Sequence, residues 1–539
     1  MSLQGLSFIG SRNGSSIGVQ FRGANPASGA QLEPAFVSAS AEDVEAAAQM
    51  TAKAQPAFGR ASGKARGTFL RKIAGNLEAG GDEIVARAML ETGLPEARLR
   101  GELARTTGQL RLFAELVEEG SWVDARIDTA LPDRKPLPRS DLRSMLRPLG
   151  PVVVFGASNF PLAFSVAGGD TASALAAGNP VIVKAHPSHP GTSELVGVAL
   201  RDAVRECGLD EGVFSLLFDE RYEVGVALVK HPLIKAVGFT GSAGAGKALM
   251  QLASSRPEPI PCYAEMSSVN PLILLPAALK ARGRQIAAGL YASFTLGSGQ
   301  FCTKPGLVFL PKGDATDDFA DELVQRVSGG MAHTMLNADI AGRYGTAVRE
   351  RVQSGKPLLL AKSASATEGA TCNPEIYVFS ANAEDLLRTP SLADEVFGPA
   401  TLLVYYTDRE ELLASATAFH GHLTATNHAV DGELAEYDDL LAILERKAGR
   451  LLINGYPTGV EVCYAMVHGG PYPATSDGRS TSVGTRAILR FTRPVCYQDF
   501  PDAALPEELR STNPLGIFRK VNGELTRAPI AGRSEHSGQ

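Results

Sequence analysis

One cysteine of the chain stands in a setting that suits a nucleophile. Cys302 lies among small residues in SGQFCTKPG, directly after residues 284–297, where apolar residues repeat at three- and four-residue spacing. This spacing predicts a buried helix that ends at glycine. A thiol held where the backbone turns sharply after a helix is well placed to attack a carbonyl carbon. The alternative is a small core residue, because free cysteine is among the most buried residue types.

Two other side chains suit acid–base and oxyanion chemistry. Glu265 follows the apolar-leaning stretch PIPCYA, and a carboxylate at the end of an apolar segment tends to have a raised pKa, which suits a general base. Asn159 follows the strand-like run VVVFG, and its amide can donate to a developing oxyanion. A solvated loop acid and an ordinary turn asparagine are the respective alternatives.

A glycine-rich segment predicts a phosphate contact. GSAGAGK, residues 241–247, has the spacing of a GxxxxGK loop, but Ala248 stands where a magnesium-binding hydroxyl belongs. We therefore do not expect a nucleoside triphosphatase. The turn at Gly241 and Ser242 still presents N–H groups that suit a dinucleotide pyrophosphate. A tight strand–helix turn without a ligand is the alternative.

Two charged residues lie where a cofactor would be held. Lys184 ends the strand-like run VIVK, at the place of a cofactor ribose or phosphate, and Glu395 precedes a Gly-Pro turn in DEVFGP, where it can contact a ribose hydroxyl. A solvated lysine and a turn-capping acid are the alternatives.

Composition excludes several classes of protein. A chain of 539 residues predicts about three folded units. A net charge of −6 without a basic run argues against nucleic acid as a partner. Six scattered cysteines, without a CxxC pair or zinc-ligand spacing, indicate a reducing compartment and no metal. No leader-like N-terminus and no apolar run of the ~18–20 residues of a membrane span is present, so a cytoplasmic protein is expected.

The apolar pattern predicts an α/β fold. Helical periodicity covers residues 41–58, 65–90 and roughly 94–119. From Gly150, strand-sized apolar runs alternate with helical segments, which is typical of a doubly wound parallel sheet. Ligands on such sheets bind at the carboxyl ends of the strands. A second α/β unit extends from about residue 266 to residue 467, and the stretch from residue 484 to residue 506 alternates at its start like a strand.

Several motifs stand in register along the chain. They are SNFP (158–161), VIVKAHPSHPG (181–191), FTGS (239–242), Glu265, GQFCTKP (299–305), EVFGP (395–399) and INGYPTGVE (453–461). With them the sequence resembles the aldehyde dehydrogenase superfamily over nearly its whole length. Residues 156–196 and YAMVHGGPYPATSD (464–477) resemble the branch that acts on α-ketoglutarate semialdehyde, also called 2,5-dioxopentanoate.

The resemblance implies roles for the catalytic residues. Cys302 would attack the aldehyde to form a thiohemiacetal, whose oxyanion the Asn159 amide and the Cys302 N–H would hold. Hydride transfer to NAD(P) would leave a thioester, and Glu265 would activate the water that releases the acid.

The same resemblance implies roles for the cofactor residues. Lys184 would contact the adenosine ribose, Gly241 and Ser242 the pyrophosphate, and Glu395 the nicotinamide ribose, with Phe397 beside it in the same motif.

Departures from the family pattern refine these expectations. NAD-preferring members often carry a glutamate three residues past the lysine, where this chain has Pro187. Losing that carboxylate removes repulsion against a 2′-phosphate, so we expect NADP to be preferred, with NAD possible. His186 can add a partial positive charge there, although its unperturbed pKa leaves it mostly neutral at pH 7. His468, in VHGGP, would lie by Cys302 and either lower the thiol pKa or assist hydrolysis; a packing histidine is the alternative.

The resemblance also implies an organisation of domains. We expect a Rossmann-type dinucleotide-binding domain (1–123 and 143–265), a catalytic domain (266–467), a small β oligomerisation arm (124–142 and 486–506) and a C-terminal extension (507–539). A homodimer or homotetramer follows from the arm. The expected substrate is a small aldehyde, foremost α-ketoglutarate semialdehyde. A long-chain or aromatic aldehyde, or a Cys/His thiol hydrolase, are the alternatives. A keto acid needs an arginine for its carboxylate, and the sequence does not single one out.

Overall fold

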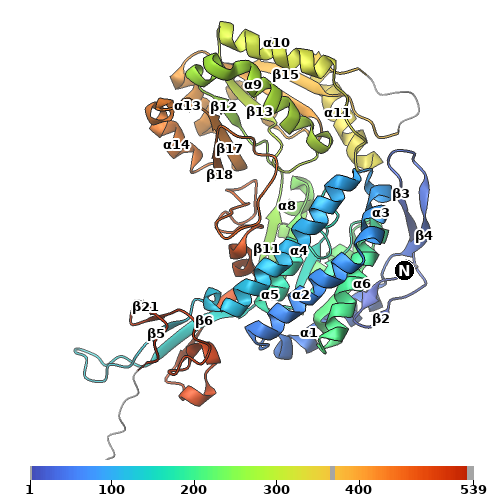
Figure 1. Ribbon diagram of the computed structural model, residues 1–539. Coiled ribbons are helices and arrows are strands. Elements are labelled where there is room, and N and C mark those ends of the chain that lie inside the picture. The colour runs from blue at the N-terminus through green and yellow to red at the C-terminus, as the bar shows by residue number, and fades with distance from the viewer. Residues whose placement is uncertain (1–2, 365–370, 531–539) are drawn as a thin grey trace, which may run out of the picture.

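The chain folds into two α/β lobes and a protruding β arm (Figure 1). The computed structural model describes residues 3–364 and 371–530. The first lobe is built on a seven-stranded sheet of order β11-β10-β7-β8-β9-β1-β2. Its strands are β1 (Phe8–Ile9), β2 (Arg12–Asn13), β7 (Val152–Phe155), β8 (Val181–Lys184), β9 (Phe214–Leu217), β10 (Ala236–Thr240) and β11 (Cys262–Glu265). The five strands from β7 to β11 are parallel, as the sequence predicts.

Helices cover both faces of this sheet, so β8 and β9 are buried along their whole length. The connecting helices are α5 (Gly169–Ala177), α6 (Pro190–Glu206), α7 (Glu223–Lys230) and α8 (Ala243–Ser254). Before them come the hairpin β3 (Gln20–Ala24) and β4 (Gln31–Val37) and the helices α1 (Ala41–Phe58), α2 (Gly63–Ala79), α3 (Gly81–Thr92) and α4 (Glu96–Glu119). The predicted helix over 41–58 is confirmed, and its start is fixed by a capping box between Ser40 and Asp43.

The prediction of one helix over 65–90 is wrong. The segment is two helices, α2 and α3, divided at Gly80, which caps the first and begins the second. Two successive glycines, Gly80 and Gly81, cost a continuous helix about 1 kcal/mol each relative to alanine, and the apolar periodicity on either side does not reveal that break.

The second lobe has a seven-stranded sheet of order β14-β15-β16-β13-β12-β17-β18. Its strands are β12 (Leu272–Leu274), β13 (Leu307–Pro311), β14 (Leu358–Lys362), β15 (Tyr377–Asn382), β16 (Ala400–Tyr406), β17 (His422–His428) and β18 (Ala448–Ile453). Its helices are α9 (Pro276–Thr295), α10 (Asp314–Ser328), α11 (Ala338–Ser354), α12 (Ala383–Arg388), α13 (Arg409–Ala418) and α14 (Asp438–Leu444). All strands but the antiparallel edge strand β14 run parallel.

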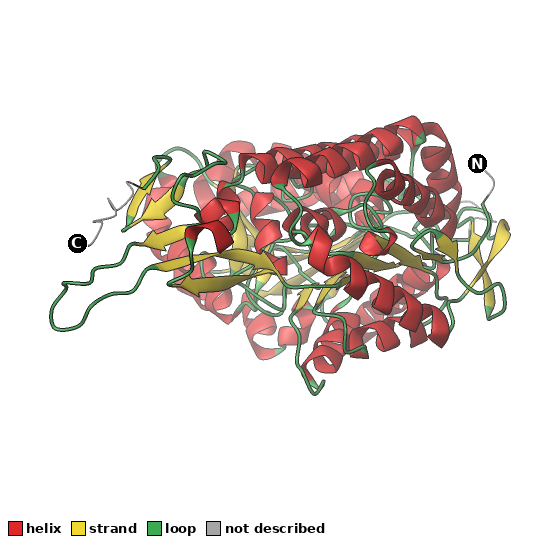
Figure 2. Cartoon of the chain, turned by 90° about the horizontal axis from the view of Figure 1, so that it is seen from below, coloured by secondary structure: helices red, strands yellow, loops and turns green. Residues whose placement is uncertain are grey.

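The arm is a five-stranded sheet of order β19-β6-β5-β20-β21, which projects from the first lobe with a long loop beside it (Figure 2). Its strands are β5 (Arg126–Asp128), β6 (Leu142–Pro148), β19 (Thr492–Gln498), β20 (Arg519–Val521) and β21 (Glu524–Thr526). The predicted strand at the start of 484–506 is wrong there, because residues Thr485–Phe491 form a 3₁₀ helix and the strand begins at Thr492.

Two features of the arm bear on the expected domains. Strand β6 pairs with β5 and β19, so residues 142–148 share the sheet of the arm. Strands β20 and β21 lie within the expected C-terminal extension and join the same sheet; residues 531–539 of that extension lie outside the described residues. The domain boundaries themselves stay a prediction.

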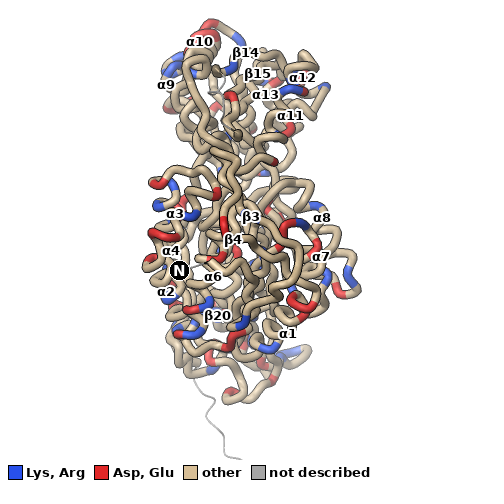
Figure 3. Tube along the Cα trace, turned by 90° about the vertical axis from the view of Figure 1, so that its right-hand side faces the viewer, with Lys and Arg blue, Asp and Glu red and all other residues tan. Residues whose placement is uncertain are grey.

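Charged residues of both signs are interspersed over the two lobes and the arm (Figure 3). Among the described residues, no helix has the length and apolar character needed to cross a membrane.

Candidate active site

The loop that carries Cys302 is held in a tight, left-handed conformation. After α9, residues Leu296–Gly299 form a 3₁₀ turn in which Gly297, Ser298 and Gly299 have φ values of 54°, 55° and 67°. A Cβ at Gly299 would lie 2.2 Å from the carbonyl oxygen of Gly398, so only glycine permits this approach of two backbones. The sequence pattern of glycines around the cysteine therefore reflects a close contact with the EVFGP motif.

An asparagine fixes the other side of the Cys302 loop. Asn270 donates through Nδ2 to the carbonyl oxygens of Cys302 (2.8 Å) and Lys304 (2.9 Å). Its own φ of 51° is a left-handed value that asparagine tolerates better than most residues. Sequence reasoning missed Asn270, although an asparagine before proline in SSVNP was the available signal.

Cys302, Glu265 and His468 lie together. His468 Nε2 is 2.9 Å from Glu265 Oε1 and 3.4 Å from Cys302 Sγ. Ser482 Oγ donates to the other carboxylate oxygen of Glu265, and the Cys302 thiol is also hydrogen-bonded to this carboxylate. Glu265 is 3% and His468 1% exposed, so the pair forms a buried polar cluster under the thiol.

The hydrogen bonds of this cluster indicate which atoms carry its protons. A carboxylate offers lone pairs alone, so the proton between Glu265 and His468 resides on Nε2 of the imidazole. With Nε2–H committed to Glu265, the thiol hydrogen has the carboxylate as its acceptor. Glu265 is thus positioned as an acceptor for the thiol proton, and His468 holds that carboxylate in place.

The pKa of Glu265 differs from the prediction. Burial alone would raise it, but the hydrogen bonds and charge contributed by His468, together with Ser482 and Cys302, outweigh burial and lower the pKa below its ordinary value. The predicted raised pKa is therefore wrong, because the sequence does not reveal the three donors that surround the carboxylate.

The pKa of the Cys302 thiol also differs from the lowered value that we expected His468 to cause. Burial raises the pKa of Cys302 well above its ordinary value, and the Glu265 charge and its hydrogen bond raise it further. His468 lies by Cys302 as predicted, yet the predicted lowering of the thiol pKa is wrong for this state. A raised pKa favours the protonated thiol, so attack on a carbonyl carbon would need a base to take the proton.

Asn159 lies against the cysteine loop. Its Nδ2 donates to the carbonyl oxygen of Gln300 (3.0 Å), which leaves the second amide hydrogen for another acceptor. The neighbouring Phe160 ring packs edge-on against Phe301, with centroids 5.3 Å apart. These contacts bring the turn after β7 next to the residue that precedes Cys302.

A pocket of about 390 Å³ opens in front of the thiol. Aromatic rings and the first half of α4 form most of its wall. Its lining residues are Ala97, Arg98, Gly101, Glu102, Arg105, Phe160, Phe164, Phe301, Cys302, Thr303, Gly459 and Val460. The volume and the mainly apolar wall suit a small organic substrate.

The carboxyl edge of the first sheet carries the predicted cofactor residues. Lys184 Nζ donates to the Asp219 carbonyl oxygen (2.9 Å), and burial lowers the Lys184 pKa to about 8. The turn at Gly241 and Ser242 is exposed and precedes α8, whose first N–H groups are free for an anion. Gly241 N also donates to the Glu265 carbonyl oxygen (3.1 Å), which ties this turn to the catalytic cluster.

These residues fit a dinucleotide. Among the residues that the structure describes, the ammonium of Lys184 has a single carbonyl partner, and no atom lies within 4 Å of the position that a Cβ at Gly244 would take, so the first turn of α8 is open. The predicted positive charge on His186 is wrong, however. Burial and the neighbouring His189 and Lys184 lower the His186 pKa well below its ordinary value, so its ring is neutral. Pro187 follows it in a half-buried turn.

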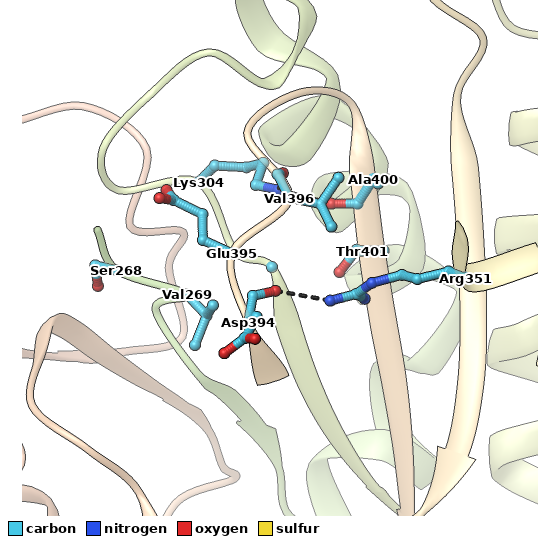
Figure 4. A pocket seen from close by; sticks show the side chains of 10 residues that line it. Ser268, Val269, Lys304, Arg351, Asp394, Glu395, Val396, Ala400 and Thr401 are labelled. Carbon is cyan, nitrogen blue, oxygen red and sulfur yellow. Dashed lines mark hydrogen bonds between the residues drawn. The ribbon is translucent and has the colours of Figure 1, made fainter. Parts of the chain in front are cut away.

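Glu395 occupies a small cleft in the second lobe (Figure 4). It lies near Lys304, whose Nζ donates to the carbonyl oxygens of Val396 (2.7 Å) and Ala400 (2.8 Å). Burial raises the Glu395 pKa, against hydrogen bonds from Ser267 and the backbone of residue 268 and the charge of Lys304.

The residue directly before the EVFGP motif is also held by a protein contact. The dashed line in Figure 4 is the bond from Arg351 Nη2 to the Asp394 carbonyl oxygen (2.7 Å). Phe397 is half-buried two residues after Glu395. The contacts of Glu395 and Phe397 with a nicotinamide ribose stay predictions.

The catalytic cluster also has the donor atoms of a metal site. One ligand atom each from Glu265, Cys302 and His468 lies within 4.8 Å of the other two, and the described residues contain no other such group of three. Sequence spacing does not reveal this group, because its members are far apart along the chain. The prediction of no metal stays a prediction.

The geometry and the fold together define the class of this protein. A family model described as "Aldehyde dehydrogenase family" matches residues 14–490, and the chain belongs to that family. Members of the family use NAD or NADP as the cofactor and an aldehyde as the substrate.

Particular relatives agree with this assignment. The chain is 52% identical over 528 residues to "Alpha-ketoglutaric semialdehyde dehydrogenase 2" of Azospirillum brasilense, covering 97% of this chain and 100% of that protein. It is 48% identical over 499 residues to "Alpha-ketoglutaric semialdehyde dehydrogenase" of Acinetobacter baylyi, covering 91% and 93%. The crystal structure of an E. coli NADP-dependent enzyme has the same fold, with a TM-score of 0.77, 21% identity, and coverage of 92% of this chain and 98% of that one.

Proposed function

We propose that this protein oxidises α-ketoglutarate semialdehyde to 2-oxoglutarate with NADP. The observation that carries the proposal is the hydrogen-bonded set of Cys302, Glu265 and His468 at the base of the 390 Å³ pocket. The two relatives at 52% and 48% identity support the choice of substrate.

The proposed mechanism begins with the thiol. Glu265 accepts the Cys302 proton as Sγ attacks the aldehyde carbon, and the new oxyanion accepts hydrogen bonds from Asn159 Nδ2 and the Cys302 N–H. Losing one such donor typically costs about 10²–10³ in rate. A bound nicotinamide would supply the hydride acceptor, and this chain would then hold the acyl group as a thioester on Cys302.

Hydrolysis of the thioester uses the same base, after the proton taken from Cys302 has passed from Glu265 to solvent. Glu265 takes a proton from the attacking water, and its lowered pKa keeps it ionised for that role at neutral pH. The bond from His468 Nε2 holds Oε1 in position, so His468 is a positioning residue. The acid departs when Sγ leaves the carbonyl carbon and regains a proton.

The residues of this chain that would face the cofactor support a preference for NADP. Lys184 would contact the adenosine ribose, Gly241 and Ser242 the pyrophosphate, and Glu395 and Phe397 the nicotinamide side. Pro187 places no carboxylate near a 2′-phosphate, and with His186 neutral, the cation nearest in sequence is Lys184. The chain therefore favours NADP because no carboxylate at residue 187 repels the 2′-phosphate, and not because an added positive charge attracts it.

The assembly we propose is a homodimer or homotetramer formed through sheet edges. Strand β19 ends the arm sheet and β18 ends the second-lobe sheet. Leu451 and Ile453 of β18 are exposed, and an exposed apolar edge strand is a template for pairing with another chain.

A panel of aldehydes assayed with both cofactors tests the function. We expect NADPH formation at 340 nm to be fastest with α-ketoglutarate semialdehyde, slower with long-chain and aromatic aldehydes, and absent in Cys302→Ala, which should keep the parent's circular dichroism. Ester hydrolysis by the parent without NADPH formation from any aldehyde would instead support a Cys/His hydrolase.

A further inference from the structure

An arginine in the wall of the active-site pocket has unused hydrogen-bonding capacity. Arg105 projects from α4 and lines the pocket that contains Cys302. Its Nε donates weakly to the Val460 carbonyl oxygen (3.4 Å), while Nη1 and Nη2 are buried and have no hydrogen-bond partner among the described residues. A guanidinium cannot be deprotonated in a protein and always carries its donors, so two unsatisfied buried nitrogens are costly.

The other charged groups of the pocket are already engaged. Arg98 Nη2 pairs with Glu102 Oε2 (3.3 Å), and its guanidinium lies 4.4 Å and 4.9 Å from the ring centroids of Phe160 and Phe301. Glu102 Oε1 accepts hydrogen bonds from the backbone N–H groups of residues 162 and 163. Glu102 is thus paired with Arg98 and with two backbone N–H groups. Its charge also acts on Arg105, but Nη1 and Nη2 of Arg105 have no hydrogen-bond partner among the described residues.

A third arginine near the thiol is also occupied. Arg450 donates through Nη1 and Nη2 to the carbonyl oxygens of Pro457 and Gly459. It thereby fixes the loop whose residues Gly459 and Val460 cover one side of the pocket. Its Nη1 and Nη2 thus bind the protein backbone, whereas both Nη atoms of Arg105 lack a partner among the described residues.

Arg105 and Cys302 line the same pocket, so a substrate bound at the thiol would share that cavity with the guanidinium. Its guanidinium carbon is 5.1 Å from the ring centroid of Phe164, which supports the flat side chain from one face. An aldehyde bound to Cys302 would extend along this wall. A carboxylate at its far end would supply the two acceptors that a guanidinium fork binds best.

We propose that Arg105 binds the carboxylate at the far end of the substrate and makes the enzyme selective for aldehydes that carry an acid group. This inference rests on the proposed function, since it names the residue that recognises an α-keto acid. It predicts selectivity against neutral aldehydes of equal length, because these would leave Arg105 without an acceptor.

The test compares α-ketoglutarate semialdehyde with pentanal, a neutral five-carbon aldehyde, in Arg105→Met, Arg105→Lys and the parent. We expect Arg105→Met to lower kcat/KM for the keto acid about 50-fold or more and for pentanal less than about threefold. Arg105→Lys should restore part of the loss, because it returns the charge without the fork. Arg100→Met is the matched control, since Arg100 is on the same helix and its ion pairs to Glu96 and Asp82 are exposed.

A binding measurement separates this inference from the proposed function. Calorimetric titration of glutarate into the Cys302→Ala protein with NADP should show binding that Arg105→Met removes. An equal loss for both aldehydes, or glutarate binding unchanged in Arg105→Met, would overturn the inference. If the parent favours pentanal while glutarate binding still depends on Arg105, the proposed substrate fails and the carboxylate site stands.

Discussion

His468 Nε2 lies 2.9 Å from Glu265 Oε1, and both side chains are almost completely buried beneath the Cys302 thiol. The relationship joins residues that are 203 positions apart in the chain. It makes Glu265 a low-pKa base and leaves the thiol with a raised pKa. Two predictions test this division of roles.

Replacing Glu265 by Gln should lower the pKa of Cys302. Burial will still raise the thiol pKa, but the second cause, the carboxylate charge, will be gone. Alkylation of Cys302 by iodoacetamide, followed by mass spectrometry against pH, should therefore have its midpoint at lower pH than in the parent. Glu395→Gln should give a smaller shift in the same direction, because its charge is a lesser cause. A midpoint that moves upward in Glu265→Gln would contradict the assignment.

Replacing His468 by Ala should raise the pKa of Glu265. Without the imidazole, burial becomes the dominant influence, so the carboxylate becomes protonated at a higher pH. The base is active when ionised, and the acidic limb of kcat should consequently move to higher pH, with kcat falling first under mildly acidic conditions. His468→Gln, whose amide can still donate to Oε1, should retain part of the parent profile. Identical pH profiles of kcat and of thiol alkylation in His468→Ala and the parent would make His468 a packing residue.

Replacing Pro187 by Glu should shift cofactor choice from NADP toward NAD. A carboxylate there would repel a 2′-phosphate and can accept from a 2′-hydroxyl. We expect kcat/KM for NADP to fall about 100-fold, on the scale of one close like-charge pair at the surface, with little loss for NAD. Pro187→Gln serves as the control of similar size without charge. A parent enzyme with kcat/KM for NAD tenfold above that for NADP would defeat the predicted preference.

Replacing Ile453 by Lys should weaken the proposed assembly. Ile453 is 51% exposed on the edge strand β18, and a charge on such an edge opposes pairing with another chain. Light scattering should report a smaller particle for Ile453→Lys at the same concentration. Leu358→Lys is the matched control, because Leu358 is 64% exposed on β14, the opposite edge of the same sheet. Equal masses for all three proteins would place the interface elsewhere.

Local patterns in the sequence determined the parallel sheets, because short apolar runs between helical segments have few other solutions. They also placed Lys184 and Gly241 at the carboxyl edge of one sheet. The same patterns did not predict the helix break that the backbone makes at Gly80. Gly80 divides the segment into two helices, although the apolar periodicity continues on both sides.

The sequence by itself supplied the identity of the chemical groups: a thiol, a carboxylate, an amide and a glycine-rich turn in a recognisable order. Only the tertiary structure decided their electrostatics. Hydrogen bonds from Ser482 and His468 reverse the pKa shift that burial alone would give Glu265. Likewise, the two Nη atoms of Arg105, which lack a hydrogen-bond partner among the described residues, are recognised only once α4 has been packed against the cysteine loop. The physical reason is that a pKa and an unsatisfied donor depend on neighbours in space, which are distant in the chain.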